Sequence, residues 1–70
     1  MNSEYLRDLG DARGYAAANY ADNVSGKPLD TLSPEGVRPL GMTAEGEMWF
    51  DDGFNKGIES YQNDQIEENE

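Results

Sequence analysis

The sequence contains no cysteine and no histidine, and only five of its 70 residues are Lys or Arg. Without cysteine it can form neither a disulfide framework nor a thiolate metal site. The lack of His and Cys also removes the commonest general base and the strongest nucleophile. We therefore expect no enzymatic activity, no catalytic residue, no metal and no cofactor.

Long apolar runs are also missing, and no stretch approaches the roughly 20 residues that a membrane-spanning helix needs. A basic, apolar leader is absent as well. From these features we expect a cytoplasmic protein, in the host cytoplasm if it is phage-encoded. A chain of 70 residues with 36% hydrophobic residues is near the size at which one core gives marginal stability. We therefore expect a single small helical domain, completed by homodimerisation.

Negative charge is abundant and unevenly distributed. The formal net charge is −10. Residues 1–42 hold six acids and four bases, a net of −2, whereas residues 43–70 hold nine acids and one base, a net of −8. Coulomb repulsion excludes direct nucleic-acid or anionic-membrane binding by the second half. The charge favours a basic protein partner, or it serves solubility alone.

Residues 3–24 have the periodicity of an amphipathic helix. Asn2 or Ser3 can cap its start, and Gly26 can end it in a left-handed conformation. Arg13 falls within the apolar side, where we expect it to pair with Glu47 or Asp64. The predicted apolar side consists of Leu6, Leu9, Ala16, Ala17, Tyr20, Ala21 and Val24.

Residues 25–42 contain all three prolines and are predicted to form a long, partly ordered connection. Ser33-Pro34-Glu35-Gly36 is typical of a turn or of the first turn of a short helix. We expect the connection to fold back over apolar surface through five side chains: Leu29, Leu32, Val37, Leu40 and Met42.

A second helix is predicted over residues 43–66, with Thr43 as its N-cap and an acidic tail at 67–70. Phe50, Phe54, Ile58 and Tyr61 recur on one face of it. Glycines lie beside this face at 46, 53 and 57, and the first helix has its own pair at 10 and 14. Each glycine in a helix interior costs about 1 kcal/mol relative to alanine. We interpret them as devices for close backbone approach, in a helical hairpin whose aromatic residues lie over small ones.

Two motif resemblances fail, one on its structural context and one on spacing. Gly10-Asp11-Ala12-Arg13-Gly14 follows no predicted strand, so it is not a dinucleotide-binding turn. Asp51-Asp52-Gly53 suggests calcium, but no register of an EF-hand loop places oxygen ligands at the required positions.

The remaining candidate is an acidic binding surface on the second helix. At a rise of about 1.5 Å per residue, its acids give roughly one carboxylate per 4 Å, close to the 3.4 Å phosphate spacing of a DNA strand. Trp49 and Tyr15 are either apolar anchors of this surface or core residues. The candidate partner-binding residues are Glu45, Asp51, Asp52, Glu59, Asp64, Glu67 and Glu68, with Met48, Trp49 and Tyr15.

In size, charge and lack of catalytic residues, the chain resembles the small acidic proteins with which phages inhibit host systems, such as DNA-mimicking anti-restriction proteins and some anti-CRISPR proteins. The resemblance implies carboxylates that stand in for phosphates in a host protein's nucleic-acid groove. Locally, residues 13–17 (RGYAA) and 49–54 (WFDDGF) are similar to segments of ribosome modulation factor and its two-helix relatives. Those proteins are basic, bind ribosomal RNA and have a shorter loop.

The sequence therefore predicts an all-α protein with two helices, a long connection and a homodimer. The functional expectation is an acidic protein that inhibits a basic, nucleic-acid-binding host protein by occupying its groove. The alternative is a structural or assembly protein that acts through its aromatic and small-residue helix faces. A third possibility is a translation-associated factor, as the second resemblance implies.

Overall fold

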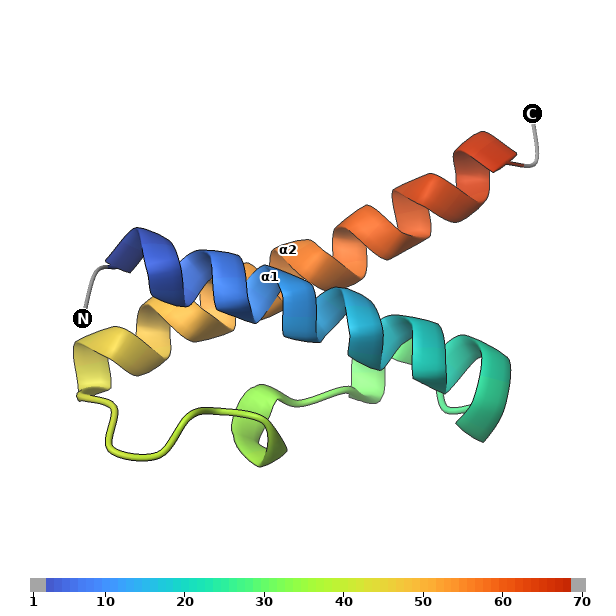
Figure 1. Cartoon of the computed structure of the whole chain (residues 1–70). Helices are drawn as coiled ribbons and strands as arrows, with labels where there is room; N and C mark the ends of the chain where they lie inside the picture. Colours follow the sequence, from blue (N-terminus) through green and yellow to red (C-terminus); the bar gives the residue numbers. More distant parts are fainter. Residues whose placement is uncertain (1–2, 69–70) are drawn as a thin grey trace.

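The computed structural model describes residues 3–68, with side chains described through residue 66. Helix α1 (Ser3–Tyr20) continues into a π-helical turn, η1 (Ala21–Ser25). Two short 3₁₀ turns follow, η2 (Leu29–Thr31) and η3 (Pro34–Gly36), and helix α2 (Ala44–Glu68) completes the chain (Figure 1). No strand occurs within residues 3–68. The predicted all-α class is confirmed.

The two helices run in the same direction. In Figure 1 the connection leaves the end of α1, returns along the length of the molecule and begins α2 beside the start of α1. Contacts agree with this path, because Gly46 faces Leu6 near the helix starts, whereas Tyr61 contacts Asp22 near the end of the first helix. The expected helix pair is thus present, but its helices are parallel, unlike the antiparallel pair that a short loop forms.

Helix boundaries follow local signals in the sequence. The first helical segment ends at Gly26, whose φ of 71° is left-handed, a conformation that glycine adopts at little cost. Helix α2 begins after Thr43, whose Oγ1 accepts a hydrogen bond from the amide of Gly46 at 3.1 Å. This bond satisfies one of the amides that a helix start leaves unpaired.

The connection is held against the helices at some points and free at others. Ser33 caps η3 by accepting a hydrogen bond from the amide of Glu35 at 3.3 Å. Of the five apolar residues expected to cover the helices, Leu29, Leu32 and Met42 are half-buried. Val37 is 42% exposed and Leu40 is fully exposed. The connection therefore covers apolar surface only in part.

Four glycines form the contact between the helices, and we call them the glycine seam. A Cβ on Gly10 or Gly14 would lie 2.1 Å from the carbonyl oxygen of Phe50 or Phe54. On α2, a Cβ on Gly53 or Gly57 would lie 2.0 or 2.1 Å from a carbonyl oxygen of α1. The backbone of each helix thus occupies the space where a side chain would lie if the other helix had a larger residue in place of glycine.

On the predicted aromatic side of α2, Phe50, Phe54 and Tyr61 are at most 3% exposed, whereas Ile58 is half-buried. On α1, however, the buried stripe differs from the predicted apolar side. Ala16, Tyr20 and Val24 are exposed, whereas the stripe at the interface consists of Leu6, Gly10, Gly14, Ala18 and Ala21. A close crossing buries the residues with the smallest side chains, so hydropathy alone placed the centre of this face incorrectly.

Candidate binding surface

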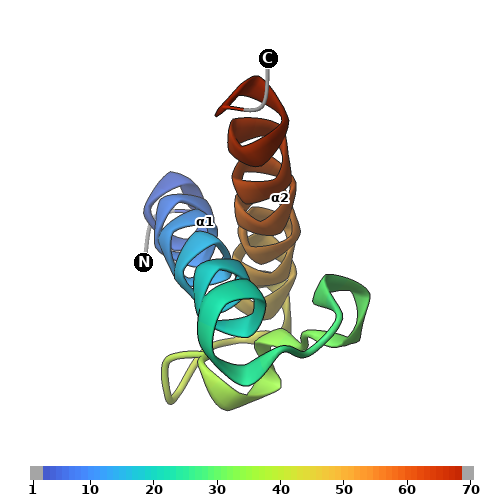
Figure 2. The ribbon, with the colours of Figure 1, turned by 90° about the vertical axis from the view of Figure 1, so that its right-hand side faces the viewer.

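The helix pair has one side covered by the connection and one side that the connection leaves open. Figure 2 shows the connection beside the pair, away from the end of α2. A shallow groove on the other side is lined by Asp8, Asp11 and Tyr15 from α1 and by Ser60 from α2. Asp64 adjoins it through a hydrogen bond from Tyr15. We call this surface the open side.

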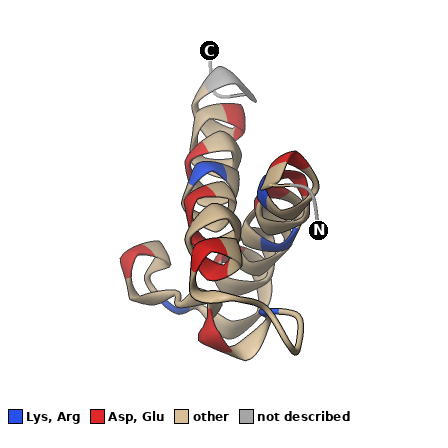
Figure 3. Ribbon diagram, turned by 90° about the vertical axis from the view of Figure 1, so that its left-hand side faces the viewer, with Lys and Arg blue, Asp and Glu red and all other residues tan. Residues whose placement is uncertain are grey.

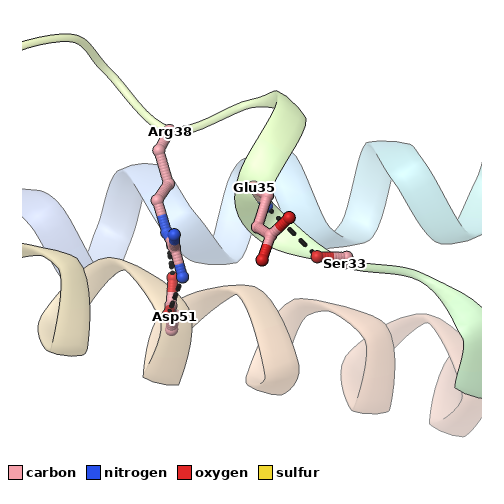
Figure 4. A network of polar contacts seen from close by, with 4 residues as sticks. All are labelled: Ser33, Glu35, Arg38 and Asp51. Atoms are coloured by element: carbon pink, nitrogen blue, oxygen red, sulfur yellow. Dashed lines mark hydrogen bonds and ion pairs between the residues drawn. The ribbon is translucent and has the colours of Figure 1, made fainter.

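Asp51, a predicted binding residue, instead holds the connection. Arg38 extends from the connection to α2, and two of its guanidinium nitrogens donate hydrogen bonds to the carboxylate of Asp51 (Figure 4). The Nε–Oδ1 distance is 2.9 Å. The hydrogen bond with Asp51 raises the pKa of Arg38 above its usual value, because it favours the charged guanidinium. Asp51 therefore has an intramolecular partner on the covered side.

Asp52 is also partly neutralised within the chain. Its Oδ2 lies 3.0 Å from Arg7 Nε and 3.7 Å from Lys56 Nζ. The Arg7 guanidinium in turn lies over the Trp49 ring, 4.7 Å from the ring centroid. This stacking is a cation–π contact. Trp49 is half-buried beneath it and so belongs to the helix contact more than to a free surface.

Tyr15 and Tyr61 connect the open side to the end of the helix pair. Their rings meet edge to face with centroids 5.5 Å apart. Tyr15 donates a hydrogen bond to Asp64 at 2.6 Å, and Tyr61 donates one to Asp22 at 2.6 Å. Asn23 donates to the Tyr61 hydroxyl at 3.1 Å. Tyr15 is half-buried, and this cluster fixes its position.

The other predicted residues have varied environments. Glu45 and Glu59 are exposed, and Met48 is 72% exposed. Glu67 and Glu68 belong to α2, but their side chains lie outside the described residues. Of the predicted binding residues, Glu45, Glu59 and Asp64 are thus exposed, while Asp51 and Asp52 form ion pairs within the chain.

Helix α1 also contributes to the acidic surface, through residues that were not among the predicted ones. Asp8 and Asp11 are both exposed and line the open side together with residues of α2. Figure 3 shows Asp and Glu along both helices. The polar side of residues 3–24 could have suggested these acids, but only the parallel packing places them beside Ser60 and Asp64.

The ion pair expected for Arg13 does not form. Arg13 is exposed, and no carboxylate of the described residues lies within 4 Å of its guanidinium. Asp64, one of its expected partners, lies on the open side beside Tyr15. Arg13 instead borders the covered side, where it lines one groove together with Leu32 and Val37 of the connection.

Comparison with known proteins gives no relative, because no family model, curated protein or solved structure matches the chain. Neither helix is long and apolar enough, over its described residues, to cross a membrane. Within those residues no group of three or more acids is arranged to hold a metal ion.

Proposed function

We propose that this chain is an acidic binding protein that inhibits a basic, nucleic-acid-binding protein by occupying its nucleic-acid groove. The supporting observation is the open side, where Asp8 and Asp11 of α1 and Asp64 of α2 carry carboxylates on one surface. Glu45 and Glu59 add exposed charge along α2, although Glu59 lies on another side of the helix, in a groove with Leu29 and Leu32 of the connection. These carboxylates take the role of phosphates in the partner's groove, and the apolar anchor is the exposed Met48.

The helices that carry these carboxylates are held rigidly, which favours binding by the surface. The glycine seam fixes the distance between the helices, and the Tyr15–Asp64 bond ties one carboxylate to the opposite helix. Carboxylates that are held in place lose less conformational entropy when they bind. Their charge also attracts a basic protein over a distance of about one Debye length, near 8–10 Å at physiological salt.

The alternative is assembly through the aromatic and small-residue faces, and the central residues of both faces are buried within the described chain. Phe50 is 0% and Phe54 is 1% exposed, and the glycines of the seam are buried in the same chain. A dimer that used these faces would have to separate the helices. For this reason we favour the acidic surface over the hydrophobic faces as the functional feature.

The test uses two exposed acids that have no described ion-pair partner, in the variant D8K/D11K. The protein is immobilised to capture partners from a lysate of its own cells, and the captured proteins are identified by mass spectrometry. We expect a nucleic-acid-binding protein that is released by high salt and by added duplex DNA. D8K/D11K should bind it about tenfold or more weakly, a loss of about 1.4 kcal/mol.

The matched control is D30K/E35K, which makes the same charge change on exposed residues of the connection. It should retain most of the binding. Equal loss in both variants would show that net charge alone drives capture. A captured protein that binds DNA and this chain at the same time would contradict groove occupancy.

A further inference from the structure

A second groove differs from the open side in both polarity and charge. It has a volume of about 360 Å³ and lies between α1, η1 and the connection. Its apolar lining includes Ala17, Ala21, Leu32 and Val37, and two cations, Arg13 and Lys27, stand beside it. We call it the basic groove.

The two cations of the basic groove are the only ones in residues 3–66 that have no carboxylate within 4 Å. Arg7 and Lys56 pair with Asp52, and Arg38 pairs with Asp51. The chain has a net charge of −10, so two cations without a carboxylate partner beside one apolar groove set this groove apart from the rest of the surface. The groove fits an acidic segment that also carries an apolar side chain.

The end of α2 has this chemistry. Ile66 is 61% exposed on the last turns of the helix, and the sequence continues with Glu67 and Glu68. Within its own chain this end cannot reach the basic groove, because α2 diverges from α1 on the side away from the connection (Figures 1 and 2). The segment is available only to another molecule.

We propose that the end of α2 docks in the basic groove of a second copy of the chain. Ile66 contacts the apolar lining, and the carboxylates that follow it lie near Arg13 and Lys27. When each copy inserts its helix end into the other, the contact is isologous and closes as a dimer. This contact does not depend on the proposed function, since it leaves Asp8 and Asp11 outside the interface.

A charge-swap experiment tests the contact. Variant R13E/K27E reverses the groove and variant E67K/E68K reverses the helix end. In each variant alone, groove and helix end carry like charges, so sedimentation velocity should show self-association weakened by about tenfold or more, or about 1.4 kcal/mol. In an equimolar mixture both contacts again join opposite charges. We expect the mixture to form a dimer.

Controls separate this contact from general attraction between charged chains. E45K/E59K has the same net charge as E67K/E68K but changes other exposed acids of α2. Labelled R13E/K27E should pair with it more weakly than with E67K/E68K, because only one of the two contacts then joins opposite charges. I66S should weaken the wild-type dimer, whereas M48S, at another exposed apolar residue of α2, should not. Circular dichroism verifies that each variant is folded.

Three outcomes would overturn the proposal. The first is a wild-type chain that stays monomeric at every concentration. The second is a dimer that neither charge reversal weakens. The third is a mixture of folded charge-swapped variants that remains monomeric.

Discussion

Along the glycine seam the two helices touch through their backbones, whereas the connection is attached to α2 through a side-chain ion pair. At the seam a single added methyl group would overlap a carbonyl oxygen. At the connection, Arg38 reaches Asp51 with a long side chain, and Leu40 nearby is fully exposed. The difference shows two ways of holding a small protein together. Backbone contact fixes the helices sterically, while a side-chain ion pair tolerates adjustment.

The largest effect should come from filling the seam. G14A places a Cβ against the backbone of Phe54, and G53A places one against the backbone of Arg7. Each should destabilise the fold by about 1–3 kcal/mol, although alanine favours the helix intrinsically. In a domain of this size, each 1 kcal/mol lowers Tm by about 4–8 °C. Thermal unfolding followed by circular dichroism measures the shift.

The control is G36A in the connection, where a Cβ would have no neighbour within 4 Å. Its Tm should stay close to that of the wild type. G46A should be intermediate, because its Cβ would meet the flexible end of Leu6 at 3.2 Å. A Tm unchanged by G14A would show that the helices are not in backbone contact.

A smaller loss of stability is expected where side chains lock the end of the seam. Y61F keeps the ring that packs on Tyr15 but removes the hydroxyl that contacts Asp22 and Asn23. We expect a loss of about 1 kcal/mol, the usual net value of such a hydrogen bond. Y5F, at a tyrosine that is 56% exposed, should leave denaturant unfolding unchanged. If Y61F and Y5F changed stability equally, the hydrogen bonds of the Tyr61 hydroxyl would not be what stabilises this end of the seam.

The smallest effect on global stability should follow from releasing the connection. R38A removes the ion pair with Asp51 but leaves the glycine seam intact. Hydrogen exchange should become faster in residues 37–42 and stay unchanged at the centres of both helices. D51A should act similarly, and the double variant should add little, because either change breaks the same pair. A global loss as large as that of G14A would make the connection part of the core.

The sequence predicts well the features that depend on neighbouring residues. Periodicity identifies both helices, and Gly26, Thr43 and Ser33 mark their ends or turns through local conformation and capping. The glycines of the seam indicate close approach because they are costly inside helices. The aromatic stripe of Phe50, Phe54 and Tyr61 follows from the same periodicity.

Features that depend on direction could not be predicted in this way. Periodicity shows which face of a helix is buried but not whether its partner runs parallel or antiparallel. For this reason Asp8 and Asp11 were left out of the acidic surface. The ion pair of Arg13 failed because the buried face of α1 was misplaced, so that Arg13 borders the covered side whereas Asp64 lies on the open side. The pairing of Arg38 with Asp51 likewise depends on the path by which the connection returns.

The parallel arrangement also determines how the chain can fold. Contacts between the helices join residues far apart in sequence, 39 positions for Tyr61 with Asp22 and 49 for Tyr15 with Asp64. A hairpin can close progressively from its loop, but a parallel pair has no short-range contact from which to begin. Because loop closure comes before these contacts form, such a topology slows folding. This small helical protein should therefore fold more slowly than its helix content suggests.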